Sequence, residues 1–126
     1  MRYFAAALGL GLLVLAGCGG QTIRIEPIRF TDVWDVVSSR YPDQGELAEP
    51  GKGVVRFTEE EDGSRYKITV EEVGKATTTV CVQYKGGPIK DGGRKQVAEQ
   101  AVLKPLMNAV LKNFGSVTIY KPKGLD

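Results

Sequence analysis

The chain has 126 residues, of which 17 are Lys or Arg and 15 are Asp or Glu, so its formal net charge is +2. This balance lacks the basic excess of a nucleic-acid-binding protein. The chain contains no histidine, the commonest general base and metal ligand. We therefore expect no enzyme, no cofactor, no bound metal and no nucleic acid.

The N-terminal residues predict a secretory signal. Arg2 supplies a positive start, and residues 4–16 form an apolar run. That run is shorter than the roughly 20 residues that a membrane span needs, whereas a basic start before a short apolar segment is typical of a signal peptide. The run closes on Leu15-Ala16-Gly17-Cys18, which resembles the lipobox of bacterial lipoproteins.

The lipobox resemblance implies that residues 1–17 are removed and that the Cys18 thiol receives a diacylglycerol with acyl chains such as palmitate. Two acyl chains anchor a protein stably. Residues 18–21 would be a lipidated tether, and residues 22–126 a single domain. Gly19 is not the aspartate associated with inner-membrane retention, which favours the outer membrane, facing the periplasm. An ordinary secretory signal or a retained short anchor is the alternative.

The first half of the domain predicts a strand, a helix and a loop. Apolar and polar residues alternate over residues 22–26, and Pro27 indicates an edge strand with a bulge. Thr31 is expected to cap a short helix that reaches about Arg40, with Trp34 in the core. Glycine, proline and acidic residues predict a solvated loop over residues 43–52.

Two turns predict a three-stranded antiparallel sheet. A two-residue turn at Asp62-Gly63 sets the register of the first hairpin. On its apolar face it pairs Val55 with Val70, Phe57 with Ile68 and Glu59 with Tyr66. On its polar face, where the charges are complementary, it pairs Arg56 with Thr69, Thr58 with Lys67 and Glu60 with Arg65. A three-residue turn at residues 74–76 pairs Val70 with Val80, Ile68 with Val82 and Tyr66 with Tyr84. All three strands then share one apolar face.

The C-terminal part predicts a helix and a strand. Asp91 can cap a helix from about Gly93 to Phe114, which Pro105 should kink or split. The helix presents one apolar stripe, formed by Leu103, Leu106, Met107, Val110 and Phe114. A last strand follows over residues 116–120. The expected fold class is α+β, an antiparallel sheet with element order β-α-β-β-β-α-β and the long C-terminal helix packed on one face.

This order resembles helix-grip and TATA-binding-protein-like modules of small outer-membrane lipoproteins, such as domains of the C component of the β-barrel assembly machinery. Residues 30–37, Phe-Thr-Asp-Val-Trp-Asp-Val-Val, are similar to the strand-to-helix start of that group. The resemblance implies a fold and assigns no functional residue.

Two functions remain open. The first is a non-enzymatic binding or scaffolding module for an envelope protein. Its docking face would be the polar side of the sheet, which could equally be plain solvated surface. The residues of this face are Arg56, Thr58, Lys67, Thr69, Glu71, Thr79 and Gln83. The alternative is a carrier of a small apolar ligand, with a pocket between sheet and helix whose residues could instead form a solid core: Phe57, Tyr66, Ile68, Val82, Tyr84, Leu103 and Met107.

Three further features carry weaker signals. Residues 87–94 have two glycines at phosphate-loop spacing but lack its Gly-Lys-Ser/Thr ending, so they are a flexible connection or a cationic spot for lipid phosphate. The acidic residues 59–62 are expected to be a solvated hairpin tip rather than a cation site. With Cys18 lipidated, Cys81 has no partner, so we expect no disulfide, and no catalytic role for this shielded thiol.

Overall fold

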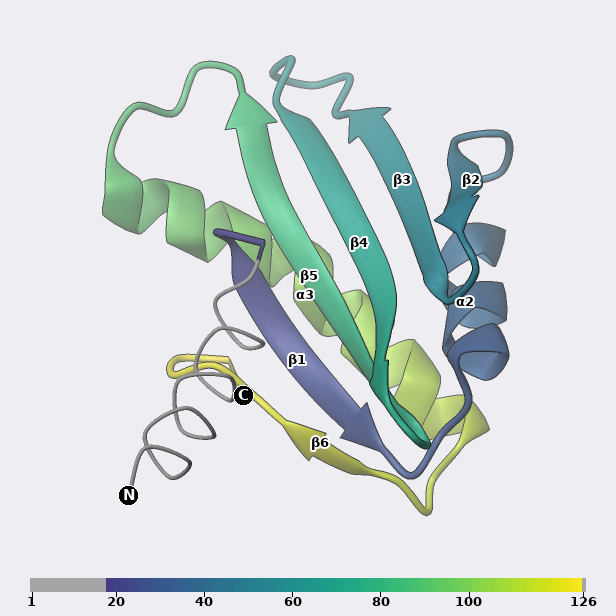
Figure 1. Ribbon diagram of the computed structural model, residues 1–126. Coiled ribbons are helices and arrows are strands. Elements are labelled where there is room, and N and C mark those ends of the chain that lie inside the picture. The colour runs from purple at the N-terminus through teal and green to yellow at the C-terminus, as the bar shows by residue number, and fades with distance from the viewer. Residues whose placement is uncertain (1–17, 126) are drawn as a thin grey trace, which may run out of the picture.

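The structure, a computed structural model, describes residues 18–125 (Figure 1). The expected signal peptide, residues 1–17, lies outside this range. The elements are β1 (Gln21–Glu26), α2 (Phe30–Ser39), β2 (Gly45–Glu49), β3 (Lys52–Thr58), β4 (Arg65–Gly74), β5 (Thr77–Gly86), α3 (Gly92–Asn113) and β6 (Thr118–Tyr120).

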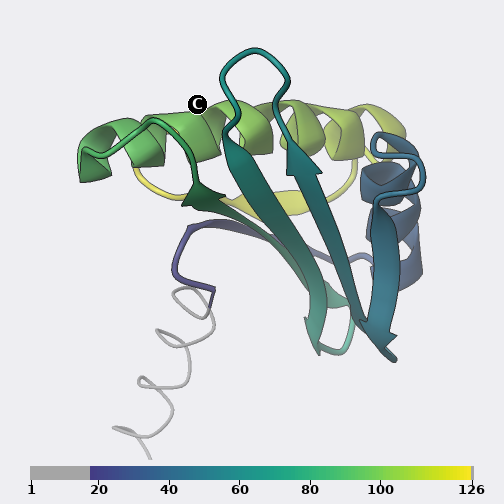
Figure 2. The same cartoon turned by 90° about the horizontal axis from the view of Figure 1, so that it is seen from above.

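The strands form one antiparallel sheet in the order β2-β3-β4-β5-β1-β6. Both helices lie on the same face of this sheet, and no element within residues 18–125 covers the other face, called the open face below (Figure 2). The predicted α+β class is confirmed, with the long C-terminal helix on one face. The element order is the predicted one with a single strand, β2, added.

Two expectations about the strands are wrong. The expected loop over residues 43–52 contains β2, because Pro50 and Gly51 (φ +79°) form a tight turn that pairs β2 with β3. The expected edge strand, β1, is an interior strand, because β6 pairs with it and places Ile119 opposite Ile25. Pro27 follows the last residue of β1, so it removes no hydrogen bond from the sheet.

The hairpins confirm one predicted register and correct the other. β4 and β5 pair Val70 with Val80 and Ile68 with Val82 as predicted, with an irregularity between Glu72 and Gly74. β3 and β4 are shifted by two residues, so that Val55 faces Ile68. The cause is a longer connection than Asp62-Gly63 alone, in which the Glu59 amide donates to the Ser64 carbonyl at 2.8 Å.

A shift of two residues keeps every side chain on its predicted face but changes its partner. Arg56 therefore faces Lys67 instead of Thr69, and Thr58 faces Arg65 instead of Lys67. The expected charge pair of Glu60 with Arg65 is thus lost, and two cations face each other at the middle of the polar face.

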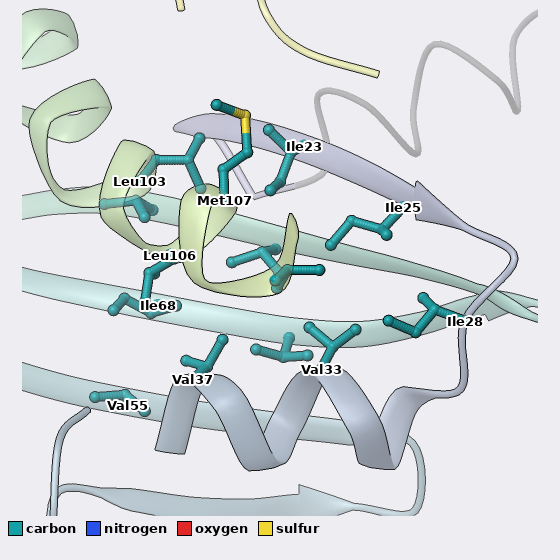
Figure 3. Packing of buried hydrophobic residues seen from close by; sticks show 14 of the residues in the cluster. Ile23, Ile25, Ile28, Val33, Val37, Val55, Ile68, Leu103, Leu106 and Met107 are labelled. Carbon is teal, nitrogen blue, oxygen red and sulfur yellow. The ribbon is translucent and has the colours of Figure 1, made fainter. Parts of the chain in front are cut away.

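The core lies between the sheet and the two helices. In Figure 3 side chains of α3 such as Leu106 and Met107 and those of α2 such as Val37 point toward the strands. The predicted stripe is confirmed, since Leu103, Leu106, Met107 and Val110 are buried and Phe114 packs beside them. α3 is one continuous helix that contains Pro105.

The predicted N-cap is confirmed for α3 and is wrong for α2. Asp91 caps α3 as expected, and its carboxylate accepts a hydrogen bond from the Arg94 amide at 2.9 Å. The N-cap of α2 is Arg29 rather than Thr31. The Arg29 side chain forms an ion pair of 3.2 Å with Asp32 in the first turn. The residue just before the helix therefore contacts the acidic residue at its start.

Trp34 fixes α2 against the β2–β3 hairpin. Its ring is half-buried, stacks on Phe30 with centroids 6.3 Å apart, and packs against the core as expected. A Cβ atom placed on Gly53 would lie 2.5 Å from the indole, and one on Gly45 would lie 3.1 Å from it. The indole therefore occupies the space that side chains at these two strand positions would need.

Replacing Gly53 with valine should destabilise the protein by about 1–3 kcal/mol, the usual cost of overpacking. Unfolding in urea followed by circular dichroism measures this loss. Adding Trp34→Ala should reduce the penalty of the valine, because the two residues compete for one space. Gly92→Ala is the control, because no atom lies within 4 Å of that Cβ position. Equal stability of Gly53→Val and the parent would contradict this packing.

Candidate functional site

The open face of the sheet carries all the residues predicted for docking. Alternation along β3, β4 and β5 turns them away from the helices, since their neighbours Val55, Ile68 and Val80 are core residues. Among these open-face residues Arg56 and Thr58 are exposed, Thr79 is only 5% exposed, and the others are intermediate: Lys67, Thr69, Glu71 and Gln83.

Positive charge gathers at the middle of this open face. Lys67 lies directly opposite Arg56 on the neighbouring strand. Burial lowers the pKa of Lys67, and the charges of Arg56, Lys85 and Lys52 lower it further. Arg56 has an acidic neighbour in Glu46, 3.6 Å away. The face therefore combines threonines with a cluster of cations, a composition suited to a polar or anionic partner.

The residues expected to line an apolar pocket belong to the packed core or border it. Ile68, Val82 and Leu103 are fully buried, and Tyr66 and Met107 are 6% and 4% exposed. Phe57 and Tyr84 are partly buried and pack against the same cluster. Phe57 also stacks between Tyr41 and Tyr66. These side chains fill the space between sheet and helices that a carrier would use for its ligand.

The two cysteines come together on the open face, contrary to the expectation of an unpaired Cys81. The structure brings their side chains together, with Cα atoms 6.3 Å apart, a separation that a disulfide can bridge. The chain turns at Gly19 (φ +74°) before it enters β1, and β1 places Thr22 opposite Cys81. Cys81 is 4% exposed, which agrees with the expected shielding. A disulfide and a lipid thioether exclude each other, because each uses the single sulfur of Cys18.

A buried acid on α3 was missed by the sequence analysis. Glu99 is 7% exposed, and its carboxylate accepts a hydrogen bond of 2.8 Å from the backbone amide of Tyr84. Tyr84 lies beyond the paired part of β1, whose register with β5 begins at Val82, so Glu99 replaces a missing strand partner. Its position four residues before Leu103, on the apolar stripe, was the available signal.

The Gly-rich connection after β5 contributes to a cationic pocket of about 310 Å³. Its lining includes Arg65, Lys85, Lys90 and Lys95, with Gly86 and Gly87 as backbone wall. The acidic residues 59–62 are exposed, as expected for a solvated hairpin tip. Within residues 18–125, no group of His, Cys, Asp and Glu side chains has the arrangement of a metal site.

Glu99 should make stability depend on pH. Burial raises the pKa of its carboxyl, while the Tyr84 amide and Lys95 oppose the rise. Between the unfolded pKa of 4.5 and the higher folded pKa, the folded protein holds a proton that the unfolded chain has lost. The contribution of Glu99 to stability is therefore complete below pH 4.5 and is lost as pH rises through the folded pKa.

Urea unfolding at a series of pH values should therefore show parent stability falling relative to Glu99→Gln above pH 4.5. Glu72→Gln, at an exposed position of β4, is the control for the substitution of a glutamate by glutamine. A stability difference that moved in the opposite direction for Glu99→Gln would show that the ionised carboxylate is favoured.

No helix among the described residues is long and apolar enough to cross a membrane. No family model, no curated protein and no solved structure matches the chain.

Proposed function

We propose that this chain is a lipid-anchored protein of the cell envelope, held in the outer membrane through Cys18, whose open sheet face binds a polar partner without catalysing a reaction. The observation that carries the proposal is the position of Cys18. The residue that closes the lipobox-like sequence lies on the face that the helices leave uncovered.

The tether between anchor and domain is shorter than expected. Gln21 already belongs to β1, and its side chain accepts a hydrogen bond of 3.0 Å from Gln100 of α3. Only Gly19 and Gly20 separate Cys18 from this fixed point. At about 3.5 Å per residue, acyl chains on Cys18 would hold the open face within roughly 10 Å of the lipid headgroups.

The charge of the open face supports a partner at that depth. The cations Arg56 and Lys67 and the surrounding threonines would face the headgroup region or a protein embedded in the same membrane. Packed core residues occupy the place of a ligand pocket, so the binding role rests on this surface. This is one proposal that includes the signal peptide, the lipid anchor and the envelope location, so the same experiment tests all three.

The intact mass of the mature protein, extracted in mild detergent from its own membrane, tests the anchor. We expect a chain that begins at Cys18 and carries diacylglycerol. After unfolding it should contain one reactive thiol, that of Cys81. The variant Cys18→Ser should lose both the added mass and its partition into the detergent phase.

The matched control for this experiment is Cys81→Ser, which should keep the lipid mass and have no reactive thiol. A mature parent chain without lipid and without a free thiol would carry the Cys18–Cys81 disulfide instead. That outcome would overturn the lipid anchor and leave the fold intact.

A further inference from the structure

A second charged feature lies at the end of the sheet where β5 leads into α3. The pocket of about 310 Å³ at this end is lined by four cationic side chains, those of Arg65, Lys85, Lys90 and Lys95. Its other lining residues are Tyr84, Gly86, Gly87 and Ile89, so no acidic side chain is among them. Its volume is at the lower end of the range for small-molecule sites.

Two glycines, Gly86 and Gly87, let the chain pack closely around the pocket. A Cβ atom on Gly86 would clash with the guanidinium of Arg65, so the absence of a side chain lets Arg65 lie over the strand. Gly87 has φ +142°, and a Cβ there would lie 2.5 Å from the Tyr84 hydroxyl. That hydroxyl accepts a hydrogen bond of 3.0 Å from the Ile89 amide. The connection is thus held against the sheet.

The four cations have no ion-pair partner among the described residues. Of the nearby acids, Asp91 caps α3 and Glu99 accepts a hydrogen bond from the Tyr84 amide, while Glu60 lines a neighbouring hollow with Arg65 and Lys85. Lys95 also lies 5.9 Å from the centre of the Tyr84 ring. Four like charges around one hollow repel one another, and an anion bound between them would relieve that repulsion.

The start of α3 lies beside the pocket, two residues after Lys90, but its amide end is already capped by the Asp91 carboxylate. The positive potential of the pocket therefore comes from the four cationic side chains. Phosphate suits the site because its oxygens can accept several charge-assisted hydrogen bonds from Arg and Lys at once.

We propose that this pocket binds a phosphate group, either free or as the headgroup of an anionic lipid. The inference goes beyond the proposed function, because the pocket is formed by β4, β5, α3 and the β5–α3 connection and does not require a lipid on Cys18.

Lysine modification tests the site in the full chain held in dodecyl maltoside micelles. Inorganic phosphate is titrated at constant ionic strength, and reductive methylation of each lysine is read by peptide mass spectrometry. Phosphate should protect Lys85, Lys90 and Lys95 and leave the exposed Lys104 and Lys112 of α3 unprotected. The same measurement in nanodiscs of phosphatidylglycerol, compared with phosphatidylcholine, provides the lipid arm.

The double variant Lys85→Gln, Lys90→Gln should raise the concentration that half-protects Lys95 at least about tenfold, because charge-assisted hydrogen bonds are lost. The matched control is Lys104→Gln, Lys112→Gln, which should leave it unchanged. Circular dichroism of each variant checks that the fold is retained.

Protection by inorganic phosphate supports a site for free phosphate. Protection only in phosphatidylglycerol supports a lipid headgroup. Equal protection of Lys104 and Lys112, or no protection in either arm, overturns the proposal. Because the intact mass reports lipid on Cys18 separately, failure here is distinguishable from failure of the anchor.

Discussion

One-sided packing of the helices on the sheet is the constraint on which the remaining features depend. The apolar stripe of α3 covers β5 and β1, and α2 covers β3 and β4, so the core residues of these strands are buried by the same layer. In the described part of the chain, no element covers the side chains of the opposite face. Three features follow from this arrangement: the polar face, the position of Cys18, and the exposure of Arg65 and Lys85 at the end of the sheet.

Local signals in the sequence predicted the elements that depend on neighbours along the chain. The β4–β5 register follows from matching two apolar patterns across a short turn, and α3 follows from Asp91 and its stripe. The place of β1 depends instead on pairing with strands far away in sequence, on both of its edges. Periodicity within β1 contains no information about those partners.

The candidate sites show the same division. The docking residues were assigned to one face correctly, because side chains alternate in any strand and a two-residue shift preserves the face. The opposition of Arg56 and Lys67 escaped prediction, since it depends on how residues 59–64 close the hairpin. Likewise, Arg65 and Lys95 are thirty residues apart and meet only through the packing of α3 on β5. The Cys18–Cys81 contact also required the β1–β5 pairing.

The two edges of the sheet bear on how copies of this chain behave when crowded. β2 is five residues long, fully exposed, and carries Glu46 and Glu49, while β6 has only three residues. A strand from a second molecule would find few free backbone groups at one edge and acidic side chains at the other. The two edges within the described residues therefore give little opportunity for the sheets of neighbouring molecules to join edge to edge.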